Sequence, residues 1–196
     1  MRQDLPRRAE RLLDRWFGPP GDPGREAERK IWFESVPEFD AALRTEFLAD
    51  HEEAAAGRLS WWEASAEGAL ALVLLLDQIP RNIFRGSPRA YASDASARAA
   101  ADRALARGFD CAVPRAWRGF FYLPFEHSED LADQERALAL FAALPPTPES
   151  PDPLRHARRH HEIIARFGRF PHRNAVLGRA STPAELAFLA EPDSSF

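Results

Sequence analysis

Residues 66–78 read Ala-Glu-Gly-Ala-Leu-Ala-Leu-Val-Leu-Leu-Leu-Asp-Gln and form the most apolar stretch of the chain. Leucine and alanine favour helix, whereas valine, isoleucine and threonine, which favour strands, are sparse throughout the sequence. No alternating apolar and polar run is bounded by hairpin-turn residues. The sequence therefore predicts an all-α fold of packed helical hairpins, in which the helix over 66–78 ends or kinks at Pro80.

Capping residues and breakers divide the rest of the chain. They predict further helices at residues 6–17, 37–56, 94–107, 129–144, 153–167 and 183–190. The predicted N-caps are Ser93 or Asp94, Ser128 and Thr182. Ser60-Trp61-Trp62-Glu63 has the form of a capping box that starts a short helical turn. The proline-rich stretch 145–153 is predicted to be a loop inside a single domain, 1–196, and no element is assigned to 192–196.

The charge balance and the apolar runs exclude several classes of protein. The formal net charge is −4, whereas general affinity for nucleic acid needs a basic surface, so no nucleic-acid partner is expected. The longest apolar run, 69–76, is far shorter than the ~20 residues of a membrane span, and the charged N-terminus lacks the apolar run of a signal peptide. A single cysteine, Cys111, excludes an intrachain disulfide and suits a reducing compartment. We therefore expect a cytoplasmic protein with no membrane partner.

Arginine supplies nearly all of the positive charge. Of the 26 basic residues only Lys30 is a lysine. Arginine is the residue of choice for bidentate pairing with carboxylate or phosphate, but a genome rich in arginine codons gives the same excess. The positions of the arginines therefore carry more information than their number.

Three of the predicted helices each place one polar side chain on an apolar face. At the i, i+3, i+4, i+7 spacing of a helix, Asp77 shares a face with three apolar residues, and Gln134 and His160 do the same in their own helices. A buried polar group without a partner costs about 1–3 kcal/mol. All three side chains are therefore expected to point inward, to find partners and to converge.

Two interpretations of these inward polar groups stay open. They can bond one another, backbone groups and nearby arginines in a structural network that locks helices and loops together. Alternatively they line a cleft, in which Asp77 and His160 act as acid, base or ligand groups while arginines grip an anion. No catalytic residue is assigned. The candidate pocket residues are Asp77, Gln78, Arg81, Asn82, Arg85, His127, Glu129, Gln134, His160, Arg166, Arg169, His172, Arg173 and Asn174.

The segment 123–130, which contains His127-Ser128-Glu129, is predicted to be a loop that leads into a helix. A helix N-terminus favours anions, but Glu126, Glu129 and Asp130 repel them, so a cation or an arginine from 166–173 suits this loop better. Internal pairing of arginine with carboxylate is the default expectation. The chain has no dense ligand motif and no cysteine pair, so neither a metal nor another cofactor is predicted. Cys111 has no base or nucleophile motif beside it.

Three long motifs carry a family resemblance. Residues 74–86, 123–130 and 167–174, together with 177–179 and 181–183, resemble the signatures of the bacterial domain of unknown function 924 family. The match runs from Trp16 to the last helix, and it implies an all-α fold similar to that of tetratricopeptide-repeat proteins. It implies no activity, because the family is named for lacking one. Glu126 departs from the family pattern, in which an apolar residue, often methionine, precedes the histidine; the extra carboxylate favours a cation beside His127.

Two functions from different classes follow. The first is a repeat-like helical scaffold that binds a protein or peptide partner in a groove. The exposed aromatics that it needs would come from Trp61, Trp62 and Trp117, although most of these are expected to lie in the core. The second is a small-molecule enzyme or binding protein. In that case Arg81, Arg85, Arg169 and Arg173 hold a small anionic ligand, and Asp77, His127, His160 and His172 transfer protons. The sequence leaves open whether the protein is an enzyme.

Overall fold

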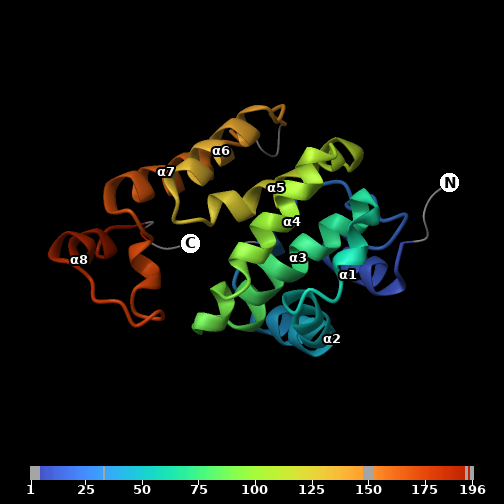
Figure 1. Ribbon diagram of the computed structural model, residues 1–196, viewed down its shortest axis with the longest axis horizontal. Coiled ribbons are helices and arrows are strands. Elements are labelled where there is room, and N and C mark those ends of the chain that lie inside the picture. Colours follow the sequence, from blue (N-terminus) through green and yellow to red (C-terminus); the bar gives the residue numbers. More distant parts are fainter. Residues whose placement is uncertain (1–4, 33, 148–151, 193, 195–196) are drawn as a thin grey trace. The chain divides into compact units, whose positions relative to one another are not determined.

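The computed structural model describes residues 5–32, 34–147, 152–192 and 194, and these contain eight α-helices and no strand (Figure 1). The helices are α1 (Arg7–Phe17), α2 (Pro37–Ala55), α3 (Ala66–Ile83), α4 (Asp94–Ala106), α5 (Arg115–Glu126), α6 (Leu131–Ala142), α7 (Arg155–Phe167) and α8 (Pro183–Leu189). The all-α class is therefore confirmed. The likeness to tetratricopeptide repeats stays a prediction. Residues 148–151 of the predicted loop, and 193, 195 and 196 of the tail, lie outside the described residues.

The chain divides into two compact units. Unit 1 comprises residues 1–85 and 89–124, and unit 2 comprises 86–88 and 125–196. Helices α1 to α4 and most of α5 belong to unit 1, whereas the end of α5 and helices α6 to α8 belong to unit 2. The single domain expected from chain length stays a prediction.

Helix α3 forms the centre of unit 1 and packs against α1, α2 and α4. Its residues 68–80 are all buried, as expected of a helix that is apolar on every side. Ser65 caps its N-terminus by accepting a hydrogen bond from the Gly68 amide (3.2 Å). The box predicted at Ser60 is not formed, although the helical turn is present at Ser60–Ala64.

The prediction that the helix ends near Gln78 is wrong, because α3 continues through Pro80 to Ile83, whereas the alternative of a kink at Pro80 stays a prediction. A proline inside a helix cannot donate to the carbonyl four residues earlier, here that of Leu76. The Ser93 hydroxyl donates to this carbonyl instead (2.6 Å). His51 Nδ1 donates to the neighbouring Leu75 carbonyl (2.8 Å). The Ser93 hydroxyl thus replaces the one backbone donor that Pro80 lacks, and the helix can extend.

Helix α4 rests on α3 through alanines. Ala97, Ala100, Ala101 and Ala104 recur at helical spacing and are at most 2% exposed. Ser93 stands at the N-cap position, as predicted, but makes no capping bond, since its hydroxyl serves Leu76. Gly108, in the left-handed region at φ 67°, follows the helix as expected of a terminating glycine.

Unit 2 has a small core between α7 and α8. Ile163, Ile164, Phe170 and Phe188 are buried together, and Phe167 packs against them. The predicted capping box at the start of α8 is confirmed: the Thr182 amide donates to Glu185 Oε2 (2.7 Å), and the Glu185 amide donates to Thr182 Oγ1 (3.2 Å).

The prediction of a loop over 123–130 is wrong in its first half, because α5 runs to Glu126 with Pro124 inside it. Pro124 removes one backbone donor, but Phe120, Phe121 and Phe125 are buried along the helix, and burial of aromatic rings outweighs that loss. Helix α6 starts at Leu131 with Asp130 as its N-cap, not Ser128. The Ser128 hydroxyl instead donates to Asp133 Oδ2 (2.6 Å).

Ser93→Ala is expected to lower the free energy of unfolding by about 1–3 kcal/mol, because the Leu76 carbonyl then stays buried without a donor. Urea denaturation followed by circular dichroism measures this change. Ser60→Ala, at an exposed serine, is the control and should change stability by less than about 0.5 kcal/mol. Equal stability of the Ser93 variant and wild type would show that the hydroxyl does not support α3.

Candidate functional site

The candidate residues form two sets, one in each unit. Asp77, Gln78, Arg81, Asn82 and Arg85 belong to unit 1, and the other nine belong to unit 2. The three side chains expected to point inward are all buried: Asp77 and Gln134 are 0% exposed and His160 is 6% exposed. Their convergence on one place stays a prediction, since Asp77 lies in one unit and the other two lie in the second.

In unit 1 the polar residues gather at the C-terminal half of α3. Gln78 Nε2 donates to Asp77 Oδ2 (2.7 Å). Asn82 lies one turn after Gln78 and is buried; in the part of the chain described here its Nδ2 has no hydrogen-bond partner. A buried donor of this kind is commonly satisfied by an ordered water molecule.

The two arginines of this set are engaged with carboxylates of unit 1. Arg81 donates to Asp94 Oδ2 (2.8 Å) and to the Ala90 carbonyl, and its guanidinium lies over the Tyr91 ring. Arg85 pairs with Asp40 at an exposed position (3.0 Å). Internal pairing, the default expectation for arginine, describes both of them better than an anion grip.

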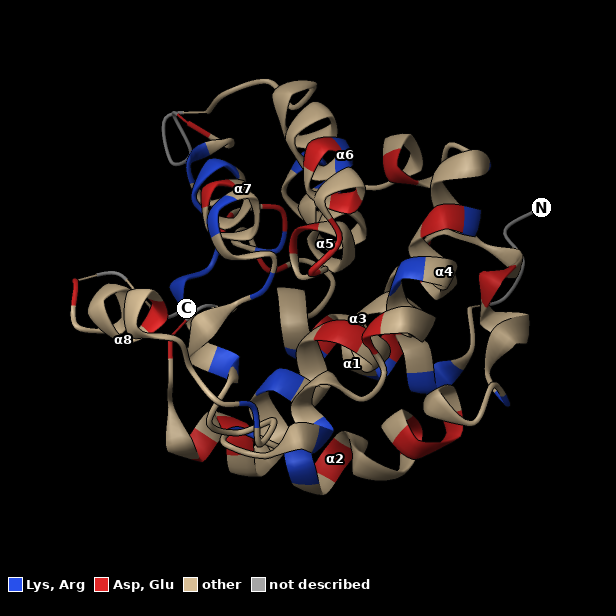
Figure 2. Cartoon of the chain, turned by 60° about the vertical axis from the view of Figure 1, so that its left-hand side comes forward, with Lys and Arg blue, Asp and Glu red and all other residues tan. Residues whose placement is uncertain are grey.

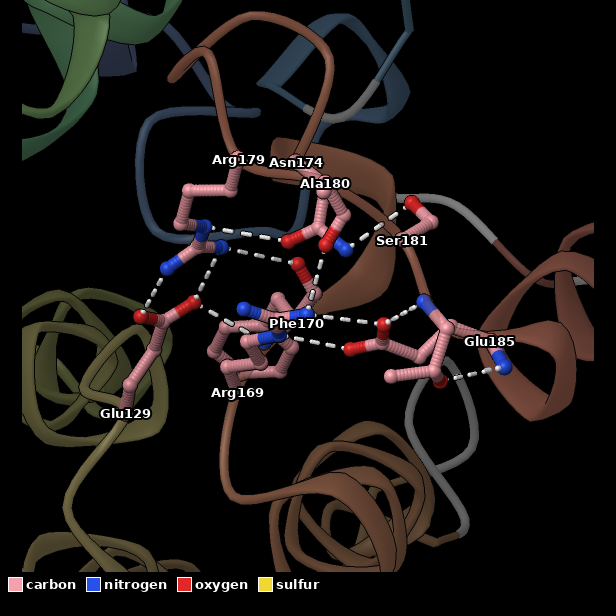
Figure 3. A network of polar contacts seen from close by, with 9 residues as sticks. Glu129, Arg169, Phe170, Asn174, Arg179, Ala180, Ser181 and Glu185 are labelled. Carbon is pink, nitrogen blue, oxygen red and sulfur yellow. Dashed lines mark hydrogen bonds and ion pairs between the residues drawn. The ribbon is translucent and has the colours of Figure 1, made fainter.

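In unit 2 a polar network surrounds Phe170 (Figure 3). Glu129 accepts two hydrogen bonds from Arg179 (2.7 and 2.9 Å) and one from the Phe170 amide (2.8 Å). Burial raises the pKa of Glu129, whereas the hydrogen bonds from Arg179 and from the Phe170 amide lower it. The net shift of the pKa is downward. Since Glu129 precedes α6 and Arg179 lies before α8, the pair joins segments 50 residues apart.

A second ion pair in the same network fixes the start of α8. Arg169 binds Glu185 through two parallel hydrogen bonds (2.6 and 2.8 Å) and donates to the Ala180 carbonyl (2.9 Å). Asn174 donates to Ser181 Oγ (3.1 Å) and accepts from Arg179 Nε (3.0 Å). This part of the candidate set is therefore a structural network of the kind expected by default.

Sequence reasoning missed three members of this network, namely Arg179, Ser181 and Glu185, as site residues. Glu185 was predicted only as half of a capping box. Its second role, as the partner of Arg169, had no local signal, because a capping glutamate looks the same whether or not an arginine reaches it.

The inward-facing amide of Gln134 binds backbone carbonyls. Its Nε2 donates to the carbonyls of Glu126 (2.6 Å) and Ser128 (2.7 Å). Carbonyls at a helix C-terminus have no partner within the helix, so Gln134 of α6 caps the end of α5. The role of this candidate residue is therefore structural.

The imidazole of His160 is held by two acceptors. Its Nδ1 lies 2.9 Å from the His156 carbonyl oxygen and 3.1 Å from Glu126 Oε1. Burial lowers the pKa of His160 to about 3, so the ring is neutral near pH 7. Since both neighbours are acceptors, the proton is on Nδ1 and Nε2 carries the lone pair. Glu126, which sequence reasoning noted only as a departure from a family pattern, is thus the carboxylate that orients this histidine.

The other candidates of unit 2 lie around the ring of Phe170 or on the surface. The Arg173 guanidinium lies over Phe170 (4.3 Å), and Arg173 Nη1 donates to the His127 carbonyl (3.0 Å). The rings of His160 and His172 are 5.4 and 5.6 Å from that of Phe170. Arg166 is exposed and lies over Phe167 (4.6 Å).

The described residues contain neither a metal-binding cluster nor a membrane-spanning helix. No group of three or more histidine, cysteine, aspartate and glutamate side chains there is placed to hold a metal ion. No described helix is both long enough and apolar enough to cross a membrane.

The comparisons with known proteins agree with this fold. Residues 12–193 match the family model described as "Bacterial protein of unknown function (DUF924)", so the chain belongs to that family. A solved structure, that of a protein of unknown function from Agrobacterium tumefaciens, is 43% identical, covers 93% of this chain and 96% of its own, and superposes with a TM-score of 0.83. No protein with a curated description matches the chain. The comparisons therefore establish the family and the fold.

The Arg169–Glu185 pair makes stability depend on pH in a defined direction. The hydrogen bonds from Arg169 and from the Thr182 amide hold the pKa of Glu185 well below its ordinary value of 4.5. The stabilisation is therefore complete above pH 4.5 and is lost as the pH falls toward the lower pKa of the folded state. Wild type should be more stable than Glu185→Gln at pH 7 and the difference should shrink below pH 4.5, as measured by urea denaturation across pH. A difference that does not change with pH would contradict this prediction.

Proposed function

We propose that the protein is a helical scaffold that binds a protein or peptide partner through Trp61. The observation that carries the proposal is the exposure of this side chain, 60%, in contrast to Trp62 and Trp117, which are 1% and 3% exposed. Of the three tryptophans considered for a partner surface, two belong to the core, as expected of most of them, and Trp61 is available.

The turn that carries Trp61 is held firmly. Glu63, two residues after Trp61, accepts two hydrogen bonds from Arg103 of α4 through its carboxylate (2.6 and 2.8 Å). Its backbone carbonyl accepts another from Arg107. The ring of Trp61 meets that of buried Trp62 edge-on at 6.3 Å. A Cβ atom at Gly68 would lie 2.2 Å from the Trp62 carbonyl oxygen, so α3 packs directly on this turn.

A rigid, exposed tryptophan suits partner binding. Tryptophan and arginine are enriched among the residues that contribute most to protein interfaces. A turn that is already held in place loses little conformational entropy on binding, which leaves more of the burial energy of Trp61 for affinity. Exposed Arg58 and Arg103 flank the turn and give its rim polar groups.

The same proposal includes a cytoplasmic location for the protein. The single cysteine, Cys111, is exposed and free. An exposed thiol is kept in that state where glutathione and thioredoxin maintain reducing conditions.

The partner proposal is tested by placing a photo-reactive phenylalanine analogue at position 61 or, as the matched control, at exposed Ser60 in cells that express the protein naturally. Position 61 should give a cross-linked adduct that an excess of wild-type protein suppresses and an excess of Trp61→Ala does not. Trp61→Ala itself should change the free energy of unfolding by less than about 0.5 kcal/mol, because the side chain is largely exposed. An adduct that Trp61→Ala suppresses equally well would contradict the proposal.

The second candidate function is a small-molecule site in unit 2, and the Glu126–His160 pair is the observation that favours it. A neutral imidazole whose Nδ1–H is fixed by a carboxylate has the arrangement of a general base and its orienting group. The His127 ring lies 6.4 Å from that of His160, and Arg173 and His172 lie beside Phe170, which the His160 ring meets. An anionic molecule with a transferable proton is therefore the class of ligand that suits this site.

The small-molecule proposal is tested by nuclear magnetic resonance of ¹⁵N-histidine-labelled protein. At pH 7 the His160 ring should show a proton on Nδ1, and at least one of a panel of small organic acids should shift the His160 ring signals. Glu126→Gln should reduce the Nδ1–H population, while Glu135→Gln, at an exposed glutamate of α6, should not. A panel without any effect on His160 would argue against the ligand, and an unchanged tautomer in Glu126→Gln would argue against the orienting role.

A further inference from the structure

An exposed arginine is held in place at the C-terminus of α4. Charged residues of both signs lie along this helix (Figure 2), and Arg107 follows its last residue. The guanidinium of Arg107 lies over the Phe109 ring, with Cζ 4.1 Å from the ring centroid, and its Nη1 donates to the Glu63 carbonyl. A stacked ring and a hydrogen bond thus position a charged group that solvent still reaches.

The positive charge of this guanidinium is not neutralised, unlike that of two arginines near it. Arg58 binds Glu53 through two hydrogen bonds (2.6 and 2.9 Å), and Arg103 binds Glu63 through two (2.6 and 2.8 Å). Among the residues that the structure describes, Arg107 makes no ion pair and only one side-chain hydrogen bond, which goes to a neutral carbonyl. Since a guanidinium has five N–H donors, Arg107 retains donors for a carboxylate from outside the chain.

The charged arginine and the exposed tryptophan meet the same short turn. Trp61 lies in the helical turn Ser60–Ala64, and the carbonyl that Arg107 binds belongs to Glu63 of that turn. Two residues of a 3₁₀ helix rise about 4 Å. An extended chain advances about 3.3–3.6 Å per residue, so a partner segment of about five or six residues can contact both groups, whichever side of the turn the indole covers.

We infer that the partner bound through Trp61 presents an acidic residue to Arg107, within about five positions of the side chain that covers the indole. This inference rests on the function proposed above for Trp61 and adds the chemistry of the partner. The unpaired positive charge selects aspartate or glutamate in the partner segment. Because the Phe109 ring and the Glu63 carbonyl already hold the guanidinium, little side-chain entropy is lost when the carboxylate binds.

A single positive charge favours one carboxylate over other anions. A phosphate carries nearly two negative charges, and its recognition uses clusters of arginines. Nucleic acid needs a basic stripe, whereas Arg58 and Arg103 are paired with glutamates. Exposed Asp102 of α4, which acts on Arg103, adds negative charge near the turn. One aspartate or glutamate among uncharged residues therefore suits this surface better than a run of acidic residues.

Phage display on the whole protein tests the inference. A library of random dodecapeptides is selected on wild type, and only those peptides that Trp61→Ala fails to bind are kept. They should share an aspartate or glutamate at one spacing from an apolar residue. Selection on Arg107→Glu should instead enrich lysine or arginine at that place, because the charge is reversed. Arg7→Glu, at an exposed arginine of α1, is the matched control and should leave the acidic preference unchanged.

The tightest peptide is then synthesised with an amidated C-terminus, so that only a side chain supplies the carboxylate. Replacement of its acidic residue by the matching amide should weaken binding to wild type about fivefold or more in fluorescence anisotropy. The same replacement should not change binding to Arg107→Gln, since the two partners of the pair are then both absent. Arg107→Lys, which keeps the charge, should retain part of the effect. Circular dichroism of each variant confirms that it folds.

The outcomes separate this inference from the proposed function. If no selected peptide depends on Trp61, the proposed function fails and the inference fails with it. If Trp61-dependent peptides show no acidic preference, or keep it on Arg107→Glu, the inference is overturned while the proposed function stands. An equal loss of affinity for wild type and Arg107→Gln on removal of the peptide carboxylate would also overturn it, because the carboxylate would then bind another group.

Discussion

A buried helix with a proline inside it is the constraint on which unit 1 depends. Helix α3 is covered along most of its length, so every polar group of its backbone needs a partner from the protein. Pro80 removes one of the donors that the helix itself would supply. The hydroxyl of Ser93 replaces this donor at the Leu76 carbonyl, and the imidazole of His51 donates to the adjacent carbonyl of Leu75. The same bonds attach α2 and the start of α4 to α3. The side chains that bind the carbonyls of α3 therefore also hold the helices of the unit together.

Unit 2 follows a similar principle with different side chains. Gln134 closes the C-terminus of α5, and Glu129 binds both the Phe170 amide and the Arg179 side chain. Polar groups in the interior of this protein therefore serve mainly to satisfy backbone groups that helix ends and loops leave open. His160 differs from them, because its Nδ1 meets a buried carboxylate as well as a carbonyl. This difference is the reason to regard it as the base of a site.

The sequence predicted those features that neighbouring residues determine. The helical period identified Asp77, Gln134 and His160 as buried side chains, and the box at Thr182 fixed the start of α8. It did not predict features that depend on residues far apart in the sequence. Ser93, which allows α3 to pass Pro80, is 17 residues from Leu76, and the partner of Glu129 is 50 residues away. Helix α5 was missed because it has no capping side chain and contains a proline; its aromatic burial is a property of the folded chain.

The alanines between α3 and α4 have a consequence for the register of the two helices. An alanine has no side-chain torsion to adjust, so these four buried methyl groups cannot re-pack if α4 shifts against α3. A slip of α4 by one residue would move it about 1.5 Å along its axis and turn its contact face by about 100°. The Ser93 hydroxyl, at the head of that helix, would then miss its carbonyl. Deletion of a single residue within α4 is thus a graver change than most replacements of its side chains.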